Sequence, residues 1–140
     1  MHIFNSLGLH RTTIGTKGSE IGNLRDPRGG TFTPDGRVAV VDTMNDRIQF
    51  FNSSGQPVST LGEKGNKLSQ FSFPADVQFI GNDLMVVDAG NSRVQIFYNS
   101  KSDKVSNYVD VYYYCANFHG GDCPCYRYLP LDSVEISLES

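Results

Sequence analysis

Short apolar runs separated by turn residues make up most of the first hundred positions. Residues 37–42 and 83–88 are almost continuously apolar and rich in β-branched side chains, which predicts buried strands. Residues 47–52 and 93–98 alternate polar and apolar positions, as half-buried strands do. Shorter flanking strands are expected at 30–33, 58–61, 76–80 and 104–108. With no clean helical period anywhere, this pattern predicts an all-β fold.

The predicted strands form two copies of one unit, displaced by 46 or 47 residues. The segment VVDTMNDRIQFF from Val40 aligns with VVDAGNSRVQIF from Val86, and IGTKG from Ile14 aligns with LGEKG from Leu61. The initial IFNSLG, from Ile3, matches FFNSSG from Phe50. A unit of about 40–50 residues with four strands is typical of a β-propeller blade. We therefore expect a partial blade at 3–15, one blade at 27–62 and a second at 74–108.

Two blades are fewer than the roughly 4–8 that close a propeller. We therefore expect residues 1–108 to be an incomplete propeller, which needs further blades or self-association to close. Residues 109–140 hold no repeat but contain all three cysteines and most of the tyrosines, so we expect a divergent or disordered tail.

The repeated residues carry a family resemblance. Each unit has an apolar strand ending in Asp, then Asn-x-Arg-[Ile/Val]-Gln, then Phe, and this pattern resembles the NHL repeat. The matching positions are Asp42, Asn45, Arg47, Gln49 and Phe51, and Asp88, Asn91, Arg93, Gln95 and Phe97. The usual His between Asn and Arg is replaced by Asp46 and Ser92. The pattern is most similar to the NHL domain of tripartite-motif proteins.

That resemblance implies a non-catalytic scaffold that recruits a protein partner, as the substrate-recognition module of a tripartite-motif ubiquitin ligase. It also implies an alternative, an RNA-binding module in post-transcriptional regulation. A remote alternative is an enzyme similar to peptide-amidating lyases, but these blades lack the histidine ligands that such an enzyme needs. No other enzyme signature is present, so we expect no catalytic residues and no cofactor.

Loops at one end of the blades are the expected partner-binding surface. Antiparallel blades place the turn between the second and third strands at the same end as the loops between blades. This end would carry Lys17, Arg25, Arg28, Asn45, Arg47, Lys64, Lys67, Asn91 and Arg93. Acidic residues map there too, and the whole chain has a net charge of −3, so the surface favours protein over RNA. Phe71 and Phe73 are the only rings near these loops, and we expect Phe73 to pack inward.

The pairs Asp42/Arg47 and Asp88/Arg93 recur at the same place in both blades. Since an active site rarely repeats in every blade, we interpret both aspartates as turn-building residues. They would accept N–H groups of the following turn and pair with the arginines. Asn45 and Asn91 suit the left-handed position of that turn.

The tail contains the one metal-like cluster, a weak zinc candidate: Cys115, His119, Cys123 and Cys125. These four would need a very compact loop, and Cys-x-Cys is tighter than the usual zinc spacing. Three cysteines cannot all pair in disulfides, so we expect free thiols and no bound metal. The sequence begins without a signal-peptide pattern and has no membrane-length apolar run, which favours a cytoplasmic protein without membrane contact.

Overall fold

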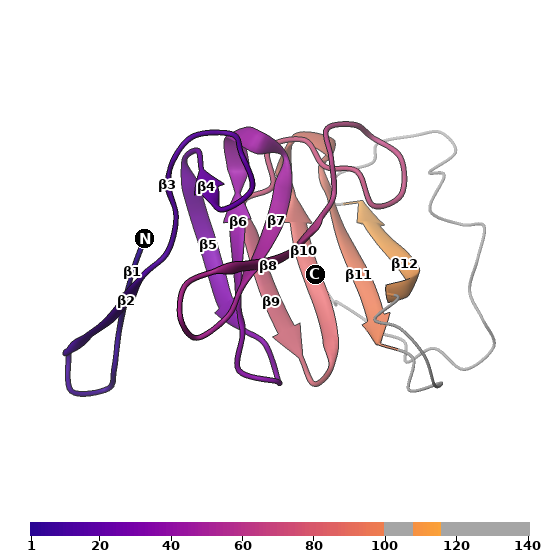
Figure 1. Cartoon of the computed structure of the whole chain (residues 1–140). Helices are drawn as coiled ribbons and strands as arrows, with labels where there is room; N and C mark the ends of the chain where they lie inside the picture. Colours follow the sequence, from indigo (N-terminus) through magenta and orange to yellow (C-terminus); the bar gives the residue numbers. More distant parts are fainter. Residues whose placement is uncertain (100–107, 116–140) are drawn as a thin grey trace.

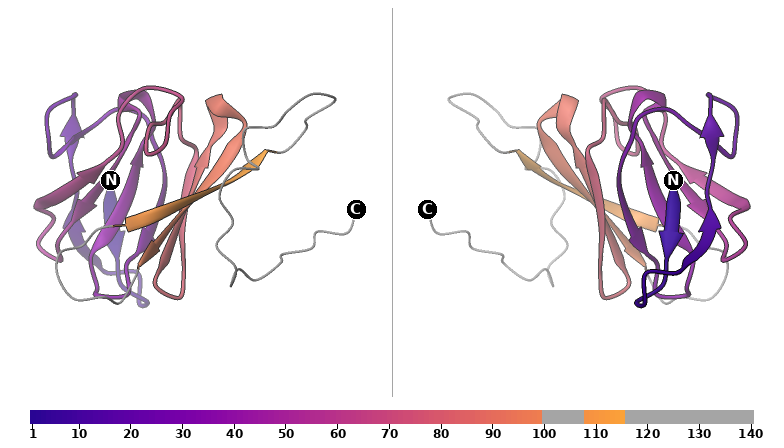
Figure 2. Two further views of the ribbon diagram at one scale, coloured as in Figure 1. Left: turned by 90° about the vertical axis from the view of Figure 1, so that its right-hand side faces the viewer. Right: turned by 90° about the vertical axis from the view of Figure 1, so that its left-hand side faces the viewer.

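The computed structural model describes residues 1–99 and 108–115, and its main features are two four-stranded antiparallel sheets side by side (Figures 1 and 2). The strands of each sheet follow one another in space as they do along the chain. The first sheet consists of β5 (Pro27–Phe32), β6 (Val38–Asp42), β7 (Arg47–Phe51) and β8 (Pro57–Leu61). The second consists of β9 (Asp76–Ile80), β10 (Asp83–Asp88), β11 (Arg93–Asn99) and β12 (Tyr108–Cys115). The all-β, two-blade prediction is confirmed.

Smaller elements precede and connect the two blades. The hairpin of β1 (His2–Phe4) and β2 (His10–Thr13) occupies the predicted partial blade, and β3 (Thr16–Lys17) pairs in parallel with β4 (Asn23–Leu24). Each blade also has a short 3-10 turn between its second and third strands. These turns are η1 (Thr43–Asn45) and η2 (Ala89–Asn91). In the described part of the chain, no helix has the length and apolar character needed to cross a membrane.

Two strands differ by more than one residue from the sequence-based prediction. β5 begins at Pro27 rather than at residue 30, and its pairing with β6 is irregular between Pro27 and Gly30. A Cβ on Gly29 would lie 2.5 Å from Oδ1 of Asp76, so the extra residue fits only because it has no side chain. The fourth strand of the second blade is β12, beyond the predicted 104–108, of which 104–107 lie outside the described residues. The second sheet therefore continues into the segment predicted as tail.

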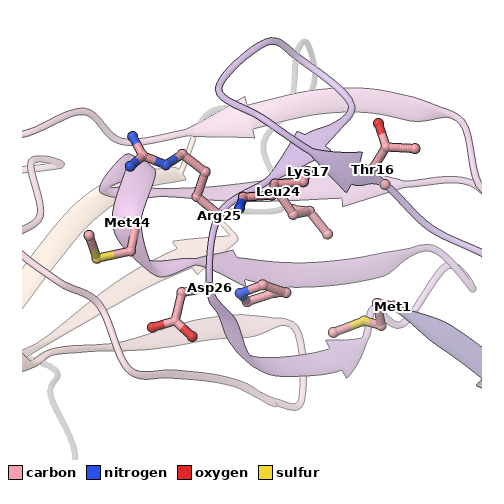
Figure 3. A pocket seen from close by; sticks show the side chains of 9 residues that line it. Met1, Thr16, Lys17, Leu24, Arg25, Asp26 and Met44 are labelled. Carbon is pink, nitrogen blue, oxygen red and sulfur yellow. The ribbon is translucent and has the colours of Figure 1, made fainter.

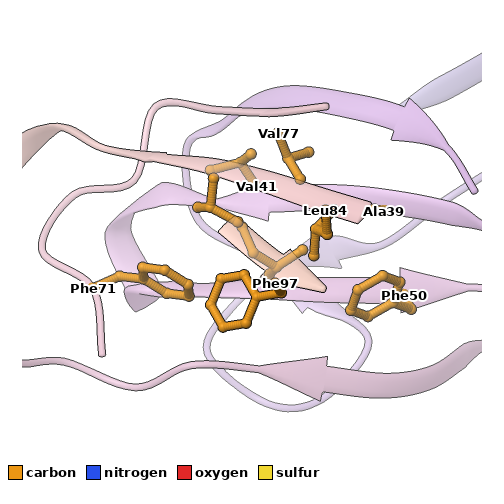
Figure 4. Packing of buried hydrophobic residues seen from close by; sticks show 9 residues of the cluster. Ala39, Val41, Phe50, Phe71, Val77, Leu84 and Phe97 are labelled. Atoms are coloured by element: carbon orange, nitrogen blue, oxygen red, sulfur yellow. The ribbon is translucent and has the colours of Figure 1, made fainter. Parts of the chain in front are cut away.

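A shared apolar core joins the two sheets (Figure 4). Ala39, Val41, Ile48 and Phe50 of the first sheet are at most 3% exposed and face the second. The second sheet contributes Val77, Leu84, Val86 and Phe97, and the loop between the blades adds Phe71. Phe71 and Phe97 meet edge to face with ring centroids 6.2 Å apart, a favourable aromatic arrangement. Burial of each large side chain contributes about 1.5–3 kcal/mol, so the blades stabilise each other.

The opposite face of the first sheet is also covered. Val38, Val40 and Phe51 pack there against Ile14 and Leu24 of the N-terminal segment. All five residues of β6 are therefore buried, which explains the continuous apolar run in the sequence. Among the described residues, only one face of the second sheet is covered by another element. Val87 of this sheet is 38% exposed, whereas the equivalent Val41 of the first sheet is fully buried.

Replacing Gly62 tests how tightly the loop between the blades packs. Gly62 has a φ of +92°, and a Cβ there would lie 2.2 Å from Cε2 of the buried Phe71. Gly36 has a similar φ of +86° but open space around it, so Gly36→Ala measures the backbone strain alone. We expect Gly62→Ala to lower the free energy of unfolding by about 1–3 kcal/mol more than Gly36→Ala, because Phe71 must move. Equal urea midpoints for the two variants would contradict this packing.

Candidate functional site

The carboxylate of Asp42, at the end of β6, is the centre of a buried polar network. Its Oδ1 accepts a hydrogen bond from the backbone N–H of Arg25 (2.7 Å). Its Oδ2 accepts from Nε of Arg47 (2.8 Å) and from Nε2 of Gln49 (2.9 Å). The Asn45 amide donates to the same carboxylate, 3.0 and 2.9 Å from its two oxygens. Although Asp42 is fully buried, its charge is compensated and its lone pairs are used.

The second blade repeats this network around Asp88. The N–H of Ser72 donates to Oδ1 (2.7 Å), and Oδ2 accepts from Asn91 (2.9 Å), Arg93 (2.7 Å) and Gln95 (3.1 Å). Asp88 is also fully buried, and the side chain of Arg93 is only 8% exposed. The same four side-chain types therefore form the same geometry in both blades.

Each network extends into the loop that precedes its own blade. In the first blade, Arg47 donates to the carbonyl groups of Glu20 (2.9 Å) and Asn23 (3.2 Å). Gln49 donates to the Asn23 carbonyl (2.6 Å) and accepts from the N–H of Gly22 (2.9 Å). These bonds satisfy polar backbone groups of the loop and fix its shape.

The second blade holds the loop between the two blades in the same way. Arg93 donates to the carbonyl groups of Asn66 (2.8 Å), Lys67 (2.7 Å) and Gln70 (2.8 Å). Gln95 donates to the Gln70 carbonyl (2.7 Å). The loop end of the molecule is therefore rigidly attached to the sheets.

Two sequence-based interpretations of this network need correction. The left-handed residues of the turns are Asp46 and Ser92, each with a φ of 53°, and not Asn45 and Asn91. The asparagines are the last residues of the 3-10 turns, from which their amides reach the carboxylate and a loop carbonyl. The backbone N–H bound by Asp42 also belongs to the preceding loop, not to the following turn. Spacing along one strand could not reveal partners 16–27 residues earlier in the chain.

A second set of polar contacts joins one blade to the next. Oδ1 of Asp46 accepts from the N–H of Phe73 (2.8 Å), and Oγ1 of Thr43 donates to the carbonyl of Pro74 (2.9 Å). Thr43 and Asp46 are 2% and 8% exposed. The Phe73 side chain, predicted to pack inward, is instead 50% exposed, and its backbone has a left-handed conformation at the joint.

The residues predicted to bind a partner fall into two groups. One group is Arg47, Arg93, Asn45 and Asn91, whose side chains form hydrogen bonds within the buried networks. The other group is exposed on the loops or at the ends of the short strands beside them and consists of Lys17, Arg25, Arg28, Lys64 and Lys67. In Figure 1 these loops lie at one end of the sheets, together with η1 and η2. Arg28 forms an exposed ion pair with Asp26 (3.0 Å).

A cavity of about 440 Å³ lies beside this exposed group, at the edge of the first blade. Met1, Leu24, Pro27 and Met44 supply apolar lining, and Lys17 and Arg25 supply positive charge. Figure 3 shows Arg25 and Met44 at one side of the cavity and Met1 at the other. Sequence reasoning missed this cavity because four separate segments build it. The one available signal was the match between residues 14–27 and the loop between the blades.

The zinc candidate remains an untested prediction. Cys115 is placed only as the last residue of β12, and His119, Cys123 and Cys125 lie outside the described residues. Among the residues whose side chains the structure describes, no cluster of three or more His, Cys, Asp or Glu could hold a metal ion.

Comparison with known proteins agrees with the repeated geometry. No family model matches the chain. The E3 ubiquitin-protein ligase NHLRC1 of Homo sapiens is 37% identical over 79 residues, which are 54% of this chain and 20% of the relative. The proteins of the same name from Rattus norvegicus and Mus musculus are each 35% identical over 79 residues. These similarities support an NHL-repeat family for the chain.

The match spans about a fifth of the length of these curated NHL-repeat relatives. The NHL pattern itself has a structural explanation here. Its Asp, Asn, Arg and Gln are the four side chains of the buried network, and its Phe, at positions 51 and 97, belongs to the apolar cores. The residues that identify the family therefore hold the loops in place.

An exposed ion pair lies at the opposite end of the first blade and contrasts with the buried pair of Asp42 and Arg47. Asp35, in the turn between β5 and β6, accepts hydrogen bonds from Arg37 and from the Thr33 hydroxyl. These bonds hold the pKa of Asp35 below its usual value. The ionised Asp35 carboxylate therefore adds to the free energy of unfolding above about pH 4. This contribution is lost as the pH falls and the carboxylate of the folded protein is protonated.

Replacing the network carboxylate should cost far more than replacing the exposed one. We expect Asp88→Asn to lower the free energy of unfolding by about 3–5 kcal/mol, because it leaves the Arg93 guanidinium largely buried without its counter-charge. Asp35→Asn is the matched control, and a surface pair contributes only about 0–1 kcal/mol. Urea unfolding of both variants at pH 7 measures the difference. Similar losses in the two variants would show that the buried network does not stabilise the blade.

Proposed function

We propose that the chain is a non-catalytic NHL-repeat module that recruits a protein partner through its loop end. The observation that carries this proposal is the exposed set Lys17, Arg25, Lys64 and Lys67, which lies in or directly beside loops that buried networks hold rigid. Loops positioned by a rigid scaffold are common binding surfaces, because their ordering cost is already met on folding.

The relatives support a more specific role. Each matched relative is named an E3 ubiquitin-protein ligase, and the similarity covers about half of this chain. We propose that this chain contributes substrate recognition to ubiquitin ligation, in a ligase of tripartite-motif type, and acts in the cytoplasm. In this proposal the transfer of ubiquitin is carried out elsewhere, and the chain supplies the selective contact.

A protein partner is favoured over RNA because two of the predicted surface cations are bound inside the blades. Arg47 and Arg93 donate to buried carboxylates and backbone carbonyls, so their guanidinium groups are committed within the blades. RNA affinity depends on phosphate contacts, each of which adds about 0.7 to the salt slope for a single strand. The remaining cations share the loop end with Glu20, Asp26 and Glu63, and this mixed surface suits a protein partner better.

Charge reversal at the loop end tests this function. Partners captured by the wild-type chain should be lost with the double variant Lys64→Glu/Lys67→Glu, because both cations are exposed on the loop between blades. They should be retained with Arg11→Glu, because Arg11 is an exposed cation on β2, outside the loop between the blades. Quantitative mass spectrometry of the captured proteins, followed by binding assays with each purified partner, provides the measurement. Partners retained equally by all three proteins would contradict a loop-end surface.

An RNA titration at about 150 mM salt distinguishes the alternative. We expect only weak binding of a random RNA pool, around 10⁻⁴–10⁻⁶ M, as for contacts without sequence specificity. Submicromolar binding that Lys64→Glu/Lys67→Glu abolishes would favour the RNA-binding alternative instead.

A further inference from the structure

Phe73 is an exposed aromatic residue at the joint between the two blades. Its side chain is 50% exposed, and it lies on the loop that connects β8 to β9. A four-stranded blade stands on each side of this loop, so both neighbours of the ring are described. A single exposed apolar side chain needs no explanation on a protein surface. The backbone of Phe73 supplies the further observation.

That backbone is strained. Phe73 lies in the left-handed region, with a φ of 47°. Asn and Asp tolerate this conformation, whereas a bulky ring is an outlier there. The repeat offset of 47 relates Phe73 to Asp26, which has a φ of 51° and a side chain that suits it. Strain of this kind is concentrated at positions that contact ligands, and here it coincides with an exposed ring.

Both blades fix the backbone that carries this ring. In the first blade, Oδ1 of Asp46 accepts a hydrogen bond from the N–H of Phe73 (2.8 Å). In the second blade, Oδ1 of Asp88 accepts from the N–H of Ser72 (2.7 Å). The N–H of Gly90 donates to the Ser72 carbonyl (2.7 Å). Little backbone freedom is therefore lost when a partner covers the ring.

The same loop adds apolar area and positive charge. Leu68 is 55% exposed. Lys64 and Lys67 are also exposed, and they take part in no ion pair among the residues that the structure describes. The one acidic side chain of the loop, Glu63, accepts a hydrogen bond from the Gln70 amide (3.0 Å). This combination is complementary to an apolar ligand that carries acidic groups.

Two other occupants fit this surface less well. A symmetric contact between two copies of the chain would place the lysines of one loop against those of the other, and like charges repel. Proteins that bind single-stranded RNA stack successive bases on several rings. This loop has only one exposed ring, because Phe71 is fully buried.

We propose that Phe73 is the apolar anchor of the partner-binding surface, and that it binds a protein segment in which an apolar side chain is flanked by acidic residues. The ring contacts the apolar side chain, and Lys64 and Lys67 pair with the acidic groups. This assignment rests on the proposed protein-recruiting function and specifies the anchor residue and the chemistry of the partner.

A display library of random dodecapeptides, selected on the full chain, provides the probe. We expect the selected peptides to combine Leu, Phe or Trp with Asp and Glu. Phe73→Asn should weaken their binding about tenfold, because it removes a central interface side chain. The same variant should raise the urea midpoint of unfolding, since Asn tolerates the left-handed backbone. A purely structural role for the ring would not combine weaker binding with higher stability.

Phe32→Asn is the matched control. Phe32 is 63% exposed at the end of β5, next to the turn that contains Asp35, and its φ is not positive. This variant should leave peptide affinity within about twofold of wild type and should not raise the urea midpoint. Phe73→Tyr keeps the ring and should retain most of the affinity.

Several results would overturn the assignment. One is a library that yields no binders, or only binders with equal affinity for wild type and Phe73→Asn. A lower urea midpoint for Phe73→Asn would show that the ring stabilises the joint instead. Submicromolar binding of a labelled oligouridine that Phe73→Asn abolishes would assign the ring to RNA. A concentration-dependent dimer that the same variant abolishes would assign it to a second copy.

The outcome separates this anchor from the broader function. Partner capture that depends on Lys64 and Lys67 but not on Phe73 would remove the anchor and leave the proposed function intact. Peptides that need Phe73, without any captured partner that depends on the loop end, would have the opposite meaning. The ring would then bind apolar ligands, and the proposed loop-end recruitment would be wrong.

Discussion

A buried carboxylate at the end of the second strand of each blade is the constraint on which the loop end depends. Asp42 and Asp88 have no exposed surface, yet each accepts hydrogen bonds from three side chains and one backbone N–H. Taking such a charge out of water is costly unless its partners are complete, and here they are. Among the described residues, no buried side-chain nitrogen or oxygen lacks a hydrogen-bond partner. The motif is therefore an all-or-none unit, because loss of one member leaves the others buried and unpaired.

The polar contacts of each blade reach both the preceding and the following segment of the chain. Each network fixes the loop that precedes its own blade, whereas Thr43 and Asp46 reach forward to Phe73 and Pro74 of the following joint. Blades in a repeat protein are stabilised largely by such nearest-neighbour contacts. The first blade has partners on both faces, the N-terminal segment and the second blade. It is therefore the blade with the most apolar packing partners among the described residues.

The periodicity of the sequence was sufficient for the strands but not for the networks. The continuous apolar run of β6 and its repeat in β10 correctly predicted the two sheets, because strand positions that are buried on one or both faces are occupied by apolar residues. The roles of Arg47 and Arg93 were only partly predictable. Their pairing with aspartate followed from spacing within the repeat, but their bonds to loop carbonyls depend on segments more than 20 residues away. The cavity was not predictable, since it forms only when Met1, Lys17, Arg25 and Met44 meet in space.

The division between internal and exposed cations decides which interactions remain available for binding. Counting every basic residue of the loops overstates the charge that a partner meets, because two guanidinium groups are spent on backbone carbonyls and buried carboxylates. The remaining lysines and Arg25 stand on loops that cannot rearrange without breaking those same bonds. A partner that binds them meets a preorganised surface, so little of its binding free energy is lost in ordering the loops. The buried residues thus set the rigidity of this surface, and the exposed residues set its charge. A substitution can change one of these properties without changing the other.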